Sequence, residues 1–248
     1  MAKKGFLKRL NSFNLWLVPL ILLVLLIVIF IIDFLYRTLF YQNHLKSCIH
    51  NDSFCGIQVI NLSLPEQFRK KLMTLSETKG KRIEIPKKHQ KNISYVELKK
   101  ELPDIDTWYN SLPQLLSPYL NETLKVVPKD VKTRICLVVY EKEGDYIDWH
   151  FDTNHFDGRF FNLIIPVTLE PTCGNYQYRN KDGVDTDVEI FKSQAILFEG
   201  DKVFHRGKML CKNQFRVILS LTYVTSDYMN PWNYLMNKMK EFGVYGTM

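Results

Sequence analysis

The second half of the chain restricts the fold most, because it is a succession of short apolar segments with no helical segment between them. The segments are rich in Val, Ile, Phe and Tyr and are separated by Gly, Asp, Asn and Lys, which is typical of β-strands. We expect strands near residues 133–141, 146–152, 159–169, 175–179, 185–190, 194–199, 203–206 and 215–224. This pattern predicts a mainly β fold, either a sandwich or a closed barrel.

The segments before these strands are more helical. Residues 65–79 place apolar side chains on one face of a helix, and residues 95–120 indicate two short helices broken at Pro103 and Pro113. The basic run 79–91 (KGKRIEIPKKHQK) is expected to be a solvated loop. We expect the helices to pack on the outside of the barrel.

An apolar segment near the N-terminus predicts a transmembrane helix. Residues 15–32 (LWLVPLILLVLLIVIFII) are apolar throughout, and at about 1.5 Å per residue they approach the roughly 30 Å of a hydrocarbon core. A cleaved signal peptide is the alternative, but its apolar core is shorter and ends in small residues, whereas residues 30–36 are bulky. Four basic residues precede the segment, so the positive-inside rule predicts a type II membrane protein of the endoplasmic reticulum or Golgi, with its main domain in the lumen.

Two features beyond the segment agree with a lumenal domain. Glycan sequons begin at Asn51, Asn61, Asn92 and Asn121. All five cysteines also follow the segment; bridges Cys48–Cys55 and Cys173–Cys211 are possible, and Cys136 is expected to be a small buried hydrophobe. The net charge of +7 is mild, so no nucleic-acid partner is expected.

The expected organisation therefore has four parts. They are a cytosolic basic tail (1–9), a transmembrane signal anchor (10–36), a stem (37–62) and a folded domain (63–248) that comprises helical support (63–130), a barrel core (131–226) and a C-terminal helix (229–242).

Polar residues on three of the predicted strands suggest a metal site. His150 and Asp152 are two apart, so on a strand they point to the same face. His205 follows an apolar strand and a Gly-Asp turn, which would return it across a barrel. Arg216 opens another strand, where its charge requires an anionic partner, and a guanidinium matches a carboxylate.

The order and spacing of His150-x-Asp152, His205 and Arg216 resemble the Fe(II)/2-oxoglutarate-dependent dioxygenases, over about 90 residues. The resemblance implies a double-stranded β-helix, a jelly-roll or cupin-like barrel with flanking helices. It also implies that His150, Asp152 and His205 hold Fe(II), that Arg216 binds the far carboxylate of 2-oxoglutarate, and that O₂ and ascorbate take part.

Residues 140–152 (YEKEGDYIDWHFD) are similar to the sequence pattern near the iron of prolyl 4-hydroxylases. That similarity implies that Tyr140, and less directly Tyr146, lies close to 2-oxoglutarate; the alternative is rings packed in the barrel wall. The chain departs from the collagen-type enzymes at Arg216, where they usually have lysine, and at residues 173–178. Aspartyl/asparaginyl β-hydroxylases share an anchor and the distal arginine but lack the carboxylate of Asp152.

The predicted anchor and the similarity of residues 140–152 together suggest hydroxylation of a lumenal or secreted polypeptide side chain. Two alternatives remain open at this point. The same chemistry could act on a small molecule, lipid or glycan, or the chain could be a non-catalytic, membrane-tethered β-barrel binding module.

Overall fold

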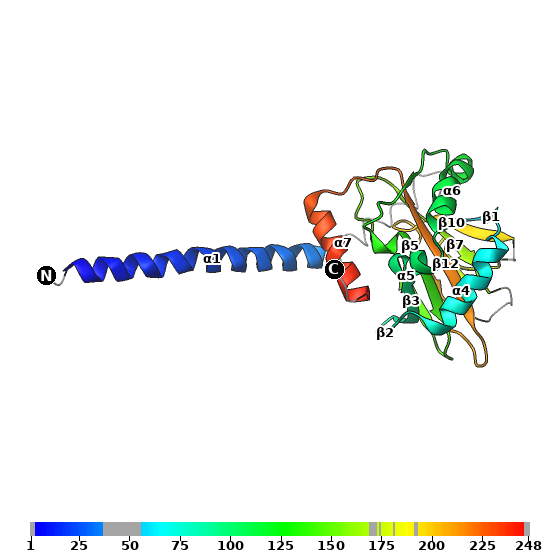
Figure 1. Cartoon of the computed structure of the whole chain (residues 1–248), viewed down its shortest axis with the longest axis horizontal. Coiled ribbons are helices and arrows are strands. Elements are labelled where there is room, and N and C mark those ends of the chain that lie inside the picture. The colour runs from blue at the N-terminus through cyan, green and yellow to red at the C-terminus, as the bar shows by residue number, and fades with distance from the viewer. Residues whose placement is uncertain are drawn as a thin grey trace. The chain divides into compact units, whose positions relative to one another are not determined.

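The computed structural model describes residues 3–36, 56–168, 173, 175–180, 182–190 and 193–245, and Figure 1 shows its elements. The chain divides into two compact units, residues 1–47 and residues 48–248. The first contains one helix, α1 (Lys3–Tyr36). Within the part of the chain that is described, no helix meets the length and hydropathy of a membrane span.

The second unit is built on a curled 12-stranded sheet in which every pair of neighbours is antiparallel. The strands are β1 (Ile57–Asn61), β2 (Lys81–Ile85), β3 (Lys88–Ser94), β4 (Lys125–Val126), β5 (Ile135–Tyr140), β6 (Tyr146–His150), β7 (Phe160–Pro166), β8 (Tyr176–Arg179), β9 (Asp185–Val188), β10 (Gln194–Glu199), β11 (His205–Gly207) and β12 (Arg216–Val224). The last eight strands match the eight expected from the sequence.

The strand order explains the curl. It runs β1-β10-β7-β12-β5-β3-β6-β11-β8-β9, with β2 paired to β3 and β4 paired to β12. From β5 to β8, strands that follow one another in the sequence lie alternately on the two sides of β3. This alternation is the arrangement of a jelly roll, in which two half-sheets face each other. The predicted mainly β fold with flanking helices is confirmed at this level.

Helices cover one face of the sheet, as Figure 1 shows for α4 and α6. The helices on this face are α4 (Glu66–Thr78), α5 (Tyr95–Glu101) and α6 (Ile105–Leu120). The domain also contains the short 3-10 helix η3 (Lys132–Arg134) and the helix α7 (Pro231–Tyr245). Alternate strand residues, such as Leu137, Leu163 and Leu219, pack with the apolar faces of α4, α5 and α6 in one core. Their neighbours along each strand therefore point the other way, into the interior of the curl.

The prediction that a helix breaks at Pro113 is wrong, because α6 continues through Pro113 and Pro118. Proline has no N–H to donate to the carbonyl four residues earlier, which for Pro113 is that of Tyr109. The Tyr223 hydroxyl donates to that carbonyl instead, at 3.1 Å. A tertiary hydrogen bond from β12 thus satisfies the acceptor that the proline leaves unpaired. Pro103, by contrast, does lie between α5 and α6, as expected.

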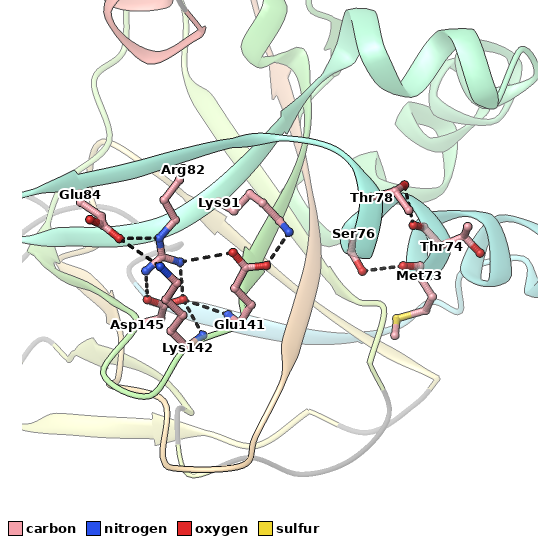
Figure 2. Close-up of polar contacts among 10 residues, drawn as sticks. All are labelled: Met73, Thr74, Ser76, Thr78, Arg82, Glu84, Lys91, Glu141, Lys142 and Asp145. Carbon is pink, nitrogen blue, oxygen red and sulfur yellow. Dashed lines mark hydrogen bonds and ion pairs between the residues drawn. The ribbon is translucent and has the colours of Figure 1, made fainter.

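The basic run is not a solvated loop but the β2–β3 hairpin, which turns at Lys87 with a left-handed φ of 72°. Figure 2 shows why its charges are tolerated: Arg82 pairs with the Asp145 carboxylate, and Lys91 contacts Glu141 at 2.5 Å. Asp145 also accepts the backbone N–H groups of Glu141 and Lys142. This network ties the hairpin to the turn between β5 and β6, on which the site below depends.

The predicted domain boundaries also need correction. β1 lies inside the expected stem, yet it pairs along its length with β10, so the folded domain begins before residue 63. The expected helical support contains the β2–β3 hairpin. The C-terminal helix is present as α7.

The disulfide Cys173–Cys211 is confirmed, and Cys136 is buried as expected. Cys48, Cys55 and the Asn51 sequon lie outside the described residues. Asn92 is only 4% exposed, inside β3, so its sequon is closed to a glycan in the folded domain; Asn61 and Asn121 are exposed.

Candidate active site

Three predicted ligands meet at the mouth of the curl. His150 ends β6, Asp152 follows two residues later, and His205 opens β11, where it pairs directly with His150 in the ladder. One ligand atom from each residue lies within 4.8 Å of the other two. The Asp152 carboxylate is 3.5 Å from Nε2 of His150 and 3.7 Å from Nε2 of His205. Two imidazoles and one carboxylate thus converge, a ligand set suited to one metal ion.

Backbone carbonyls fix both histidine rings. Nδ1 of His150 lies 2.7 Å from the Asp148 carbonyl oxygen, and Nδ1 of His205 lies 2.8 Å from that of Val203. Because a carbonyl can only accept, each Nδ1 carries the proton and donates. The lone pair of each ring is therefore on Nε2, the nitrogen that faces Asp152. Metal-binding histidines are usually oriented by such an outer hydrogen bond.

The protonation states also suit a metal site. Burial, reinforced by the charge of His150, lowers the pKa of His205 to about 4, so this imidazole is neutral at neutral pH. Burial opposes ionisation of Asp152, but the adjacent imidazoles of His205 and His150 outweigh it and hold the pKa of this carboxyl well below its ordinary value. A neutral imidazole and an ionised carboxylate are the forms that bind metal.

Asp152 is held by residues that sequence reasoning did not identify. Asn162 on β7 donates from Nδ2 to the Asp152 carboxylate, and the Thr222 hydroxyl on β12 contacts Oδ1 of Asn162 at 3.3 Å. The Asp152 N–H donates to the Gly200 carbonyl at 2.9 Å. A Cβ on Gly200 would lie 2.8 Å from Oδ2 of Asp152, so the glycine is required for this close approach. The alternation along β7 and β12 is the sequence signal that could have revealed Asn162 and Thr222.

Arg216 and Tyr140 form a second polar pair. They are register partners on β12 and β5, and the Arg216 guanidinium lies 3.9 Å from the centre of the Tyr140 ring. Among the described residues, Nε of Arg216 is buried without a hydrogen-bond partner, and Nη2 donates to the Lys208 carbonyl at 3.4 Å. Burial lowers the pKa of Arg216 and raises that of Tyr140. A Cβ on Gly207 would lie 3.2 Å from Nη2 of Arg216 and 3.3 Å from the Tyr140 hydroxyl, so glycine keeps this corner open.

Tyr146, by contrast, lies against His89 and not with Arg216 and Tyr140. Its ring lies against His89, 5.1 Å between centroids, and it is absent from the described residues that line the cavity. The cause is a β-bulge: His205 pairs with His150 but Gly207 pairs with Ile147, so β6 has one extra residue here. The bulge reverses the alternation, and Ile147 faces the cavity in place of Tyr146.

One cavity of about 180 Å³ contains all three predicted ligands and Tyr140. Its apolar wall includes Val138, Ile164, Phe198 and Ile218. Tyr176 also lines it, and its ring stacks on His205 with centroids 5.5 Å apart. The polar lining that the sequence did not predict includes five residues of β3 and α7: Lys88, Gln90, Asn92, Asn237 and Lys240.

Comparison of the sequence with family models and with curated proteins gives no match. Solved structures do match the fold. A Pseudomonas putida prolyl-4-hydroxylase superposes with a TM-score of 0.50 at 14% identity, covering 73% of this chain and 98% of that one. A prolyl hydroxylase from Trichoplax adhaerens, in complex with a hypoxia inducible factor peptide fragment, gives 0.54 at 11% identity, covering 77% and 93%.

The non-heme α-ketoglutarate-dependent epimerase SnoN from nogalamycin biosynthesis gives a TM-score of 0.55 at 10% identity, covering 73% of this chain and 82% of that one. Identities this low establish the fold alone. The domain has the fold of the Fe(II)/2-oxoglutarate-dependent oxygenases, the group that includes the prolyl hydroxylases.

Proposed function

We propose that this chain is an Fe(II)- and 2-oxoglutarate-dependent dioxygenase in which His150, Asp152 and His205 hold the iron. The observation that carries the proposal is that two Nε2 atoms and one carboxylate lie close enough together to bind the same metal ion. Both Nδ1 atoms are engaged by backbone carbonyls. Two histidines and one carboxylate on one face are the ligand set of non-haem Fe(II) oxygenases. The similar protein SnoN has been solved with Fe³⁺ and α-ketoglutarate, which supports the same cofactors here.

Arg216 and Tyr140 are assigned to the far carboxylate of 2-oxoglutarate. Arg216 has an unpartnered Nε and makes no ion pair with any residue in the described part of the chain. A partly buried guanidinium without an anion is costly, and a carboxylate would remove that cost. The Tyr140 hydroxyl, kept protonated by burial, is a second donor beside it.

When bound, the iron and 2-oxoglutarate supply the oxidising chemistry that hydroxylates a C–H bond with O₂; ascorbate would keep the iron reduced. The residues of the chain provide geometry and exclude water. Asn162 and Gly200 hold the carboxylate of Asp152, and the carbonyls of Asp148 and Val203 aim the two rings. The apolar lining of the cavity keeps bulk water from the reacting centre.

A titration of the purified full-length chain with Fe(II) and 2-oxoglutarate, without oxygen, tests this assignment. We expect a weak visible charge-transfer band that is lost in His205→Ala and kept in His89→Ala, because His89 is not among the described residues lining the cavity. A folded wild-type protein that binds neither ligand would contradict the proposal and favour the non-catalytic binding module.

The proposed substrate is a polypeptide side chain, as in prolyl hydroxylases. The peptide complex of the Trichoplax adhaerens enzyme and the similarity of residues 140–152 support this choice. The similarity to an epimerase of nogalamycin biosynthesis supports a small molecule as the second candidate. Mass spectrometry of products after incubation with peptide and metabolite pools would separate the two, through a mass gain of one oxygen atom.

We further propose that residues 10–36 anchor the protein in the membrane of the endoplasmic reticulum or Golgi, with the domain in the lumen. The proposal depends on the apolar segment, the four basic residues before it and the cysteines beyond it. Protease digestion of sealed microsomes should leave the domain intact, and glycosidase treatment should shift its mass if Asn61 or Asn121 is modified. Digestion of the domain without detergent would contradict this topology.

A further inference from the structure

A second set of polar side chains lines the cavity and has no part in the chemistry above. Lys88, Gln90 and Asn92 alternate along β3 and so share its inner face, whereas Lys91 points outward to Glu141. Asn237 and Lys240 are three residues apart on α7, so they lie on the same side of that helix. Two elements that are distant in sequence thus bring two ammonium groups and several amides to one cavity.

The two lysines have no counter-ion of their own. Within the described residues, neither Lys88 nor Lys240 forms an ion pair or a side-chain hydrogen bond, and Asp152 is the sole carboxylate that lines the cavity. Glu241, next to Lys240 in the sequence, is already engaged by the Lys132 N–H and by Lys238.

Loading the site with its cofactors does not supply that counter-ion. The two charges of Fe(II) and that of Arg216 are cancelled by Asp152 and by the two carboxylates of 2-oxoglutarate. Half-buried Lys88 and exposed Lys240 would then remain as two positive charges at the cavity with no ion-pair partner among the described residues. Two ammonium groups at one cavity attract negative charge, so an anionic group of the substrate is expected to bind there.

Two buried amides in the same cavity have unused hydrogen-bonding capacity. Gln90 is 2% exposed and donates to Asn92 at 2.6 Å, but its Oε1 has no partner in the described part of the chain. Asn237 is 3% exposed, and its Nδ2 has no partner. Buried polar atoms are rarely left unpaired, which indicates a ligand with its own donor and acceptor. A peptide group has both.

We infer that the substrate is an acidic polypeptide segment: an anionic group beside the hydroxylated side chain contacts Lys88 and Lys240, and its peptide groups bind Gln90 and Asn237. This inference rests on the proposed function. The anionic group is a carboxylate or a phosphate, since both match a pair of ammonium groups.

Three fluorescent randomised peptide pools test the inference. They differ at one fixed position, which is glutamate, phosphoserine or glutamine, and binding to the full-length chain with Fe(II) and 2-oxoglutarate is measured anaerobically by anisotropy. We expect an acidic pool to bind about tenfold more tightly than the glutamine pool, with a preference that falls as salt rises. The better acidic pool identifies the anion.

Lysine variants locate the effect. Lys88→Gln and Lys240→Gln should each reduce the preference severalfold, and the double variant should abolish it, with affinity for 2-oxoglutarate unchanged. Lys100→Gln, an exposed lysine on α5, is the matched control and should behave as wild type. Thermal unfolding of each variant confirms that it is folded.

Several results would overturn the inference: equal binding of all pools, no binding of any pool, or lysine variants that weaken 2-oxoglutarate instead. Its failure is distinguishable from failure of the proposed function. If the protein shows the charge-transfer band and releases succinate, but the acidic and glutamine pools behave alike, only the acidic substrate is refuted. A lysine-dependent acidic preference without any band would refute only the oxygenase chemistry.

Discussion

Replacing Asn162 with alanine tests how far the support of Asp152 controls metal binding. Asn162 is buried, donates to the Asp152 carboxylate and is itself contacted by Thr222. The substitution removes one hydrogen-bond donor from the ionised carboxylate of Asp152 and leaves all three predicted metal ligands in the sequence. Asp152 should therefore remain present but less well oriented.

Two independent estimates give the size of the effect. A hydrogen bond to a charged group contributes about 1.5–3 kcal/mol. Loss of an outer partner of a metal ligand typically weakens metal affinity by about 10–100-fold. At about 1.4 kcal/mol per factor of ten, that range corresponds to roughly 1.4–2.8 kcal/mol, so the two estimates agree. We expect Fe(II) affinity to fall within this range.

The assay is anaerobic competition for Fe(II) between the protein and a coloured chelator. Asn180→Ala is the matched control, because Asn180 accepts backbone N–H groups in the exposed turn between β8 and β9. A folded Asn162→Ala protein with wild-type Fe(II) affinity would refute the reasoning, since Asp152 would then need no support from β7.

Three further predictions concern the co-substrate, pH and the disulfide. Arg216→Gln should raise the Kd for 2-oxoglutarate by about tenfold or more at unchanged Fe(II) affinity, measured by calorimetry, and an unchanged Kd would remove Arg216 from the site. Burial and the charge of Glu199 raise the pKa of Asp201 from 3.8 to about 6. Between these two pH values the folded state keeps a proton that the unfolded state releases, so stability is lost as the pH rises from the lower value to the higher. Asp201→Asn should therefore stabilise the domain by up to about 3 kcal/mol at neutral pH and little at about pH 4, by urea unfolding at both; equal effects would contradict it. Removing Cys173–Cys211, which closes a separation of 38 residues, should cost up to about 4 kcal/mol of unfolding free energy, and an unchanged midpoint would contradict this stabilisation.

The candidate metal site was predictable because its signals are local. His150 and Asp152 share a short segment, His205 follows an apolar strand and a Gly-Asp turn, and Arg216 opens a strand whose apolar pattern is plain. Residues that alternate along a strand point to alternate faces whatever the partner strand, so the pattern alone separates helix-facing from cavity-facing positions. The eight core strands were predictable for the same reason.

Other features depend on neighbours that are remote in the chain. Lys88 lies in a run whose charges suggest a loop, and only pairing of β3 with β5 and β6 turns it inward. Tyr146 has the right alternation for the cavity, but a bulge opposite β11 reverses it. Helix α6 continues past Pro113 because Tyr223 on strand β12 donates to the Tyr109 carbonyl, which the proline leaves unpaired.

The sequence by itself therefore determined the class of fold, the three proposed metal ligands and the arginine, since periodicity and residue chemistry are properties of short segments. The tertiary structure alone decided which side chains meet there: Asn162 reaches Asp152, and a lysine of β3 shares the cavity with a lysine of α7. Their meeting follows from strand register and from the docking of a distant helix, which are set by the packing of the whole domain and not by local pattern.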